Sequence, residues 1–164
     1  MDAFRVIASK RDERRYADRP VPEDVVERIL DAGRLSGNSQ NKQIWRFVVV
    51  EDPDRRERLA QAVYAPGNVR GATLVIGITG RAYDTGRCSQ NMMLAAWNEG
   101  VASCPNGIRD AAAAAEALDL EEGELAMVIS FGYPARPRDP ASRTAEEWSA
   151  RANRKPLGEL VRRL

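Results

Sequence analysis

The side chains that usually carry enzyme chemistry are sparse in this sequence. Its 164 residues include no histidine and only two cysteines, Cys88 and Cys104. The common zinc and copper ligand sets and the histidine-based catalytic triads are therefore excluded, and the sequence predicts no metal site. If the protein catalyses a reaction, we expect a bound group rather than a side chain to supply the reactive atom.

Four cations gather near the amino terminus: Lys10, Arg11, Arg14 and Arg15. One interpretation is a solvated charged turn, because Asp12 and its acidic neighbours lie close enough in sequence to pair with them. The other is a phosphate clamp, in which each charge-assisted hydrogen bond contributes ~1.5–3 kcal/mol. The spacing alone leaves both interpretations open.

A second polar stretch, SGNSQNKQ at residues 36–43, runs directly into an apolar segment that starts at Trp45. Such residues often satisfy their own backbone through Asx-type turns, which would make this an ordinary loop. The alternative is recognition of a heteroaromatic ligand whose edge alternates hydrogen-bond donors and acceptors. The amides that could serve are those of Asn38, Asn41 and Gln43, together with the Ser39 hydroxyl.

Two further stretches could contact a charged ligand. The segment SCPNG, residues 103–107, is either a simple turn with Cys104 as a small buried side chain, or a place where backbone N–H groups near a helix start stabilise negative charge. The segment NRKPL, residues 153–157, carries a basic pair that is by default part of a solvated tail.

These residues must be positioned by helices and strands that the apolar pattern predicts. Helices are expected near residues 1–9, 23–35, 52–63, 85–99 and 108–118, and strands at 45–50, 72–80 and 125–131. The strand at 45–50 is expected to be covered on both faces because it is almost entirely apolar. Strands separated by helices indicate an α/β or α+β sandwich.

The composition is that of one ordinary globular domain spanning residues 1–164. The chain is 43% hydrophobic and 30% charged, and its formal net charge of +1 creates no field that would recruit nucleic acid. No apolar run approaches the ~20 residues needed to cross a bilayer. With no signal pattern and no disulfide framework, we expect a cytoplasmic protein. The tail, residues 135–164, is poor in apolar residues and is expected to wrap a partner subunit.

Several blocks in order carry a family resemblance: KRDERRY, PVPEDVVERIL, SGNSQNKQIWRFVVV, DTGRCSQNMMLAAWNEGVASCPNG, FGYP and RKPL. Together they resemble the nitroreductase-like FMN-dependent oxidoreductase family over nearly the whole chain. The most specific block is the amide-rich loop followed by Asn-x-Gln-x-Trp and a strand. The resemblance implies an α+β fold, an α-β-α sandwich whose mainly antiparallel sheet is flanked by helices, with an extended C-terminal tail. It also implies a homodimer that holds FMN between its subunits.

The resemblance assigns roles residue by residue, all of them in cofactor binding and none as a catalytic side chain. The phosphate would be held by Lys10, Arg11 and Arg14, joined by Arg154 and Lys155 from the tail. Asn38, Ser39 and Asn41 would reach the flavin of the partner subunit, with Gln43 supporting their loop. Backbone N–H groups of Asn106 and Gly107 would face N5 and O4 of the ring, and Asn68 would face its pyrimidine edge.

The implied reaction is ping-pong: NADH or NADPH gives hydride to flavin N5, and a nitroaromatic, quinone or enone then takes the electrons. Two alternatives stay open. One is a flavin-binding protein of this fold with altered or lost reductase activity, such as dehalogenation or flavin breakdown. The other is a non-enzymatic interaction domain. Asp12, where the family commonly has serine, and the short stretch between Gly80 and Asp84 are the departures that favour an altered function.

Overall fold

The computed structural model describes residues 2–164, which form two compact units. The larger unit is Arg11–Arg138, and the smaller one combines the described residues up to Lys10 with Asp139–Leu164. Each unit is described by itself below. The expected organisation, a single domain over residues 1–164 whose tail wraps a partner, stays a prediction.

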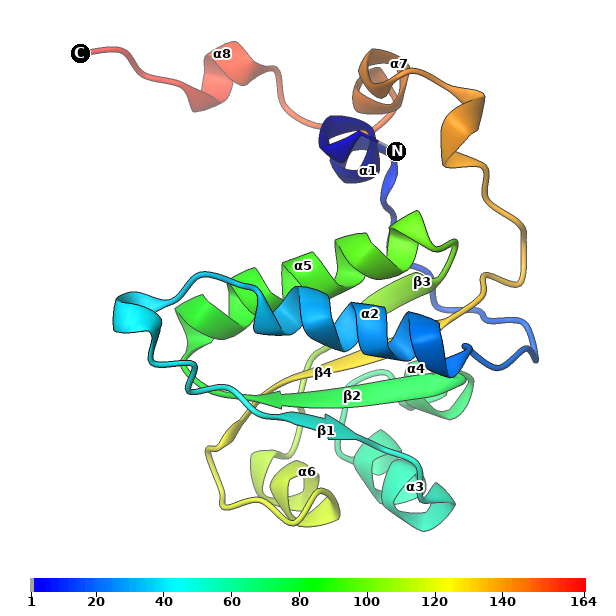
Figure 1. Ribbon diagram of the computed structural model, residues 1–164, viewed down its shortest axis with the longest axis vertical. Coiled ribbons are helices and arrows are strands. Elements are labelled where there is room, and N and C mark those ends of the chain that lie inside the picture. The colour runs from blue at the N-terminus through cyan, green and yellow to red at the C-terminus, as the bar shows by residue number, and fades with distance from the viewer. Residues whose placement is uncertain (1) are drawn as a thin grey trace. The chain divides into compact units, whose positions relative to one another are not determined.

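The larger unit is built on a four-stranded sheet (Figure 1). Its strands are β1 (Phe47–Val49), β2 (Leu74–Thr79), β3 (Ala102–Asn106) and β4 (Leu125–Gly132), in the spatial order β1-β2-β4-β3. Every neighbouring pair is antiparallel. All six residues of β2 are buried, so this strand forms the centre of the core. The expected α+β fold with an antiparallel sheet is confirmed.

Helices cover both faces of this sheet (Figure 1). On one face, α2 (Glu23–Arg34) and α5 (Ala82–Asn98) enclose a cluster that includes Ile29, Ile76 and Met92. On the other face, α3 (Pro53–Gln61), α4 (Pro66–Arg70) and α6 (Ala111–Ala117) enclose a second cluster that includes Leu59 and Val128. The sheet is therefore buried on both sides, which leaves its two outer edges for contacts.

Three sequence expectations differ from the structure. The strand expected at residues 45–50 is only β1, whose residues are half-buried because it is an edge strand rather than a central one. The segment SCPNG is not a turn, because residues 103–106 belong to β3. The helix expected over 108–118 starts later, at Ala111, because the Asp110 carboxylate caps it by accepting the Ala113 N–H at 3.0 Å.

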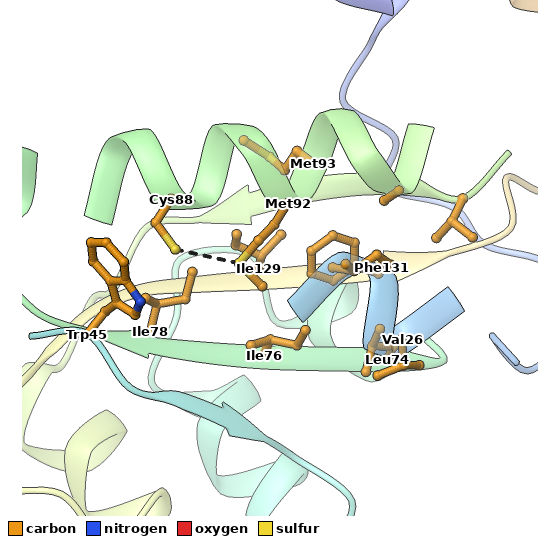
Figure 2. Close-up of a cluster of buried hydrophobic side chains, with 13 residues drawn as sticks. Val26, Trp45, Leu74, Ile76, Ile78, Cys88, Met92, Met93, Ile129 and Phe131 are labelled. Carbon is orange, nitrogen blue, oxygen red and sulfur yellow. Dashed lines mark hydrogen bonds between the residues drawn. The ribbon is translucent and has the colours of Figure 1, made fainter. Parts of the chain in front are cut away.

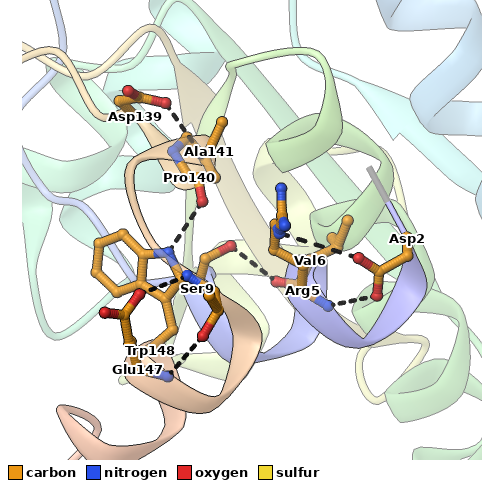
Figure 3. A network of polar contacts seen from close by, with 10 residues as sticks. Asp2, Arg5, Val6, Ser9, Asp139, Pro140, Ala141, Glu147 and Trp148 are labelled. Atoms are coloured by element: carbon orange, nitrogen blue, oxygen red, sulfur yellow. Dashed lines mark hydrogen bonds and ion pairs between the residues drawn. The ribbon is translucent and has the colours of Figure 1, made fainter.

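The smaller unit contains α1 (Ala3–Ser9), a 3₁₀ turn η2 (Pro140–Ser142), α7 (Ala145–Ala150) and α8 (Leu157–Leu160). Helix α7 starts at a capping box in which Thr144 and Glu147 exchange hydrogen bonds. The Trp148 indole N–H donates to the Pro140 carbonyl at 2.9 Å, which ties α7 to η2 (Figure 3). Helix α1 packs against α7 in the same unit.

Candidate functional site

Residues 12 and 13, within the basic run near the amino terminus, lie along the outer edge of β3. Asp12 forms a parallel β-bridge with Ser103, and the Glu13 N–H donates to the Ser103 carbonyl at 3.2 Å. The backbone around Arg11 and Arg14 is therefore fixed to an edge strand that is distant in sequence. The bridge and the hydrogen bond join residues 12–13 to β3, a pairing that the sequence pattern could not predict.

The acidic residues of this run do not pair with all of its cations. The Glu13 carboxylate accepts a hydrogen bond from Nε of Arg138 at 2.7 Å, so it is engaged by a cation outside the run. Arg14 is exposed, and among residues 2–164 its side chain has no ion-pair or hydrogen-bond partner. Arg11 is half-buried and Asp12 is exposed. The Arg14 guanidinium is thus open to solvent, and its assignment to a phosphate stays a prediction.

The same edge of β3 ends in an exposed backbone donor. Alternate residues of a strand direct their backbone groups to the same edge, so 103, 105 and 107 share the outer one. Pro105 has no N–H to offer there. The Gly107 carbonyl accepts the Tyr64 N–H at 3.0 Å, whereas the Gly107 N–H donates no hydrogen bond within residues 2–164. An extended chain rises ~13 Å from Ser103 to Gly107. The basic run, held at Ser103 by residues 12–13, and the Gly107 donor therefore lie at the two ends of one short edge.

A buried polar cluster lies directly behind this edge. The Asn106 amide nitrogen lies 3.1 Å from both Ser130 Oγ and the Cys104 carbonyl oxygen. Its oxygen accepts from the Asn68 amide nitrogen at 3.1 Å. Both asparagine side chains are buried and used inside the protein. The Asn106 side chain therefore fixes the backbone that leads to Gly107, and the expected contact between Asn68 and the flavin edge stays a prediction.

Tyr16 connects this cluster to the basic run. Its hydroxyl donates to the Glu13 carbonyl at 2.8 Å and lies 3.2 Å from Ser130 Oγ. Burial raises the pKa of the Tyr16 phenol above its ordinary value, so the group is neutral at physiological pH. The two ends of the β3 edge are thus held by one network of neutral hydrogen bonds. Sequence reasoning missed Tyr16 and Ser130; a polar residue inside the apolar strand 125–131 was the available signal.

The amide loop, residues 36–43, partly satisfies its own backbone. The Asn38 side-chain oxygen accepts the Gln43 N–H at 2.8 Å. Gln40, Asn41 and Gln43 have positive φ angles of 53°, 52° and 48°, a left-handed conformation that asparagine tolerates better than most residues. Ser39 and Asn41 are exposed. None of the hydrogen bonds of this loop reaches β3, so within one chain the loop and the β3 edge are separate parts of the predicted site.

Two contacts hold the ends of this loop. The Asn91 amide of α5 donates to Ser36 Oγ at 2.8 Å. At the other end, the Trp45 indole is only 5% exposed and lies among the core side chains, near Cys88 and Ile78 (Figure 2). The loop is therefore polar at its tip and anchored in the core, as the sequence order of amides followed by Trp45 predicted.

The remaining predicted phosphate ligands belong to the smaller unit. Lys10 ends the first segment of that unit, and Arg154 and Lys155 are exposed on the segment between α7 and α8. Their assignment to the phosphate stays a prediction.

An ion pair supports the helix that carries Asn68. Arg70 of α4 donates to both carboxylate oxygens of Glu57 on α3, from Nε at 2.8 Å and from a terminal nitrogen at 2.6 Å. These bonds, with a further one from Gln61, lower the pKa of Glu57 to about 2, against an ordinary value of 4.5.

This lowered pKa predicts acid sensitivity. A carboxylate whose pKa is lower in the folded state stabilises the fold above its unfolded pKa, and the contribution disappears as the pH falls through the folded pKa. We expect Glu57→Gln to make the free energy of unfolding depend less steeply on pH between about 4.5 and 2, as measured by urea unfolding at several pH values. The same slope in both proteins would show that the pair contributes nothing.

Neither a metal-binding group of side chains nor a membrane-spanning helix is found in the described part of the chain. Among residues 2–164, no three Cys, Asp or Glu side chains are grouped so that they could bind a metal ion. In the same residues, no helix has the length and apolar character needed to cross a bilayer.

Comparison with known proteins identifies the family of this chain. The sequence profile of the Nitroreductase family matches residues 7–81 and 76–133. A Methanothermobacter thermautotrophicus protein named as a candidate NADH dehydrogenase/NAD(P)H nitroreductase is 27% identical over 150 residues, which cover 82% of this chain and 78% of that protein.

Two solved structures show the same fold. A protein from Desulfovibrio desulfuricans named as a candidate nitroreductase, in complex with FMN, is 28% identical, with a TM-score of 0.80 over 98% of this chain and 96% of that one. NADPH:FMN oxidoreductase from Vibrio harveyi, complexed with NAD⁺, is 24% identical, with a TM-score of 0.75 over 84% of this chain and 73% of that one. The chain therefore belongs to the nitroreductase family, and the predicted enzyme class, a flavin-dependent oxidoreductase of the NAD(P)H nitroreductase type, is confirmed.

Proposed function

We propose that this protein binds FMN and uses it to carry electrons in ping-pong order from NADH or NADPH to a nitroaromatic, quinone or enone. The observation that supports this most directly is the outer edge of β3. Residues 12 and 13 of the basic run pair with Ser103 at one end of this edge, and the unpaired Gly107 N–H follows its other end. A molecule with a phosphate at one end and an electron-accepting ring at the other matches that arrangement of charges and donors.

The residues present fit this cofactor. Arg14 offers an unpaired guanidinium, whose planar fork suits a phosphate. We assign the Gly107 N–H, which has no acceptor within residues 2–164, as the donor to the ring edge that gains negative charge. When bound, FMN supplies the chemistry by taking hydride from the nicotinamide at N5 and returning electrons to the acceptor. The chain binds and orients the reactants and stabilises charge, which explains how an enzyme without histidine can act.

The relatives support the same cofactors. The Desulfovibrio desulfuricans structure contains FMN, and the Vibrio harveyi enzyme is named an NADPH:FMN oxidoreductase and is complexed with NAD⁺. We extend the binding of FMN and the use of a nicotinamide cofactor to this chain, because of the family match and the β3 edge. The assigned phosphate ligands are Lys10, Arg11, Arg14, Arg154 and Lys155, and the assigned ring contacts are Asn68, Asn106 and Gly107.

A second copy of the chain completes the proposed site. The exposed Ser39 and Asn41 belong to a loop that makes no hydrogen bond to the β3 edge of its own chain, so we assign them, with Asn38 and the supporting Gln43, to the site of the partner. The smaller unit also exposes large apolar side chains, including Phe4, Ile7, Leu157 and Leu160. A partner subunit that covered these side chains would remove apolar surface from water, which supports the proposed homodimer with a wrapping tail.

Two features favour a different reaction as the second candidate. Asp12 is exposed on the same edge as Arg14, and a carboxylate ~4 Å from a phosphate would cost about 4 kcal/mol at an effective dielectric near 20. In addition, β2 passes to α5 through Gly80 and Arg81 alone, so that this connection holds no lid element. A flavin-binding protein with altered activity, such as dehalogenation or flavin breakdown, would also fit these features.

Purified protein separates the candidates. We expect it to bind FMN, to lose flavin absorbance when NADH or NADPH is added without oxygen, and to regain it on adding a quinone or a nitroaromatic. Bound FMN that is not reduced would favour the second candidate. Failure to bind FMN would overturn the proposal. Light scattering on the same sample is expected to give about twice the 18.2 kDa chain mass, and a flavin-bound monomer would contradict the shared site.

A further inference from the structure

Tyr64 has an exposed ring on a rigidly held backbone. Its side chain is 72% exposed although it is large and partly apolar. Its N–H donates to the Gly107 carbonyl at 3.0 Å, and the preceding residue, Val63, is fully buried and forms an antiparallel bridge with Ile108. The ring is therefore presented to solvent from a fixed position beside the end of β3.

The ring lies directly against Gly107. A Cβ atom added at Gly107 would be 3.1 Å from Tyr64 Cδ2 and 3.8 Å from Cε2, so the glycine leaves the space that the ring edge occupies. Gly107 does not have a positive φ, and its backbone conformation is therefore open to any residue. The close approach of Tyr64, not the local turn geometry, is what favours glycine at this position.

This contact places the Tyr64 ring next to any ligand atom that accepts a hydrogen bond from the Gly107 N–H. An acceptor lies ~2.9 Å from the donor nitrogen, and that nitrogen is ~1.5 Å from its Cα, so the acceptor lies within about 5 Å of the Gly107 Cα. The Tyr64 ring contacts the same Cα region from the side. A planar ligand that uses the Gly107 N–H is therefore a neighbour of the Tyr64 ring.

We propose that Tyr64 is a specificity-determining residue whose ring borders the planar rings bound at Gly107 and favours flat, conjugated electron acceptors. The proposal rests on the proposed function, because it takes the Gly107 N–H as a contact of the cofactor ring. An exposed phenol ring gains contact area and quadrupole interaction with another flat ring, but much less with a branched aliphatic group. Tyr64 therefore biases the site toward quinones and nitroaromatics by contact rather than by hydrogen bonding.

Three variants of the full-length protein test this. Tyr64→Leu removes the aromatic ring, and Tyr64→Phe keeps a ring without the electron-rich phenol. Tyr83→Leu is the matched control, since Tyr83 is 75% exposed on α5 and does not contact Gly107. All three changes are at exposed side chains, so we expect unfolding midpoints close to that of the wild type.

The first readout is the emission of bound FMN, which does not depend on turnover. A phenol close to an excited flavin quenches its emission by electron transfer. We expect brighter bound FMN in Tyr64→Leu and Tyr64→Phe than in the wild type, and unchanged emission in Tyr83→Leu. The second readout is steady-state kinetics: Tyr64→Leu is expected to raise KM for a quinone about threefold to tenfold with little change in kcat, whereas Tyr64→Phe stays near wild type.

The outcomes distinguish this inference from the function on which it rests. If the wild type binds and reduces FMN but Tyr64→Leu has unchanged emission and unchanged KM, the role of Tyr64 is overturned and the proposed function stands. If the wild type binds no FMN, the proposed function itself fails. An equal change in Tyr83→Leu would also overturn the proposal, because the effect would not be specific to the ring beside Gly107.

Discussion

Replacing Arg14 with alanine is expected to weaken FMN binding about tenfold to a hundredfold, because the change removes a charge-assisted hydrogen bond of ~1.5–3 kcal/mol. The Arg14 side chain is exposed and has no partner within residues 2–164, so its removal leaves no buried group unsatisfied. The effect should therefore appear in affinity and not in stability. Titration of the apoprotein, followed by FMN fluorescence, measures the dissociation constant.

Two comparisons make this result specific to the phosphate. Riboflavin lacks the phosphate, and we expect the wild type and Arg14→Ala to bind it with equal affinity. Arg58→Ala, at an exposed arginine of α3, changes the net charge by the same amount and should leave FMN affinity unchanged. If Arg14→Ala binds FMN as tightly as the wild type, the phosphate clamp has been assigned to the wrong residues.

The largest effect on stability is expected from Trp45→Ala. The indole is 5% exposed within the core cluster that lies between the sheet and helices α2 and α5 (Figure 2). Truncating a buried tryptophan to alanine typically costs about 3–5 kcal/mol, because both transfer free energy and packing contacts are lost. Since natural domains unfold with ~5–15 kcal/mol, this is a large part of the total. Urea unfolding monitored by circular dichroism measures the change.

The neighbouring residue provides the control. Ile44 is 36% exposed, and Ile44→Ala should change the free energy of unfolding by no more than about 0.5 kcal/mol. A loss below about 1 kcal/mol in Trp45→Ala would mean that the indole does not anchor the amide loop in the core.

The sequence predicted the regular elements well where local pattern determines them. The expected helix at 23–35 is α2, Glu23–Arg34, because apolar residues such as Val26 and Ile29 recur at helical spacing. The strand order could not be read from such patterns, since it depends on pairing between distant segments. The edge position of β1 was missed for this reason: an apolar run looks the same whether its strand is central or not.

The same distinction between local pattern and long-range pairing applies to the candidate site. The cations near Arg14 and the donor at Gly107 could each be picked out from residue type, and the family resemblance assigned them to opposite ends of one ligand. Their location on a common edge depends on the bridge between Asp12 and Ser103, which no local rule predicts. Tyr64 had no sequence signal at all, because it stands two residues before helix α4 with no neighbouring polar motif, and only its contact with Gly107 gives it meaning.

Pro105 has a consequence beyond ligand binding. Exposed sheet edges invite strands of other molecules to pair with them, and this is a frequent start of aggregation. At the outer edge of β3, the backbone of residues 12–13 already occupies Ser103, and Pro105 cannot donate to an incoming strand. The edge is thus largely closed to a foreign strand, so that the chain is less prone to aggregate through β3.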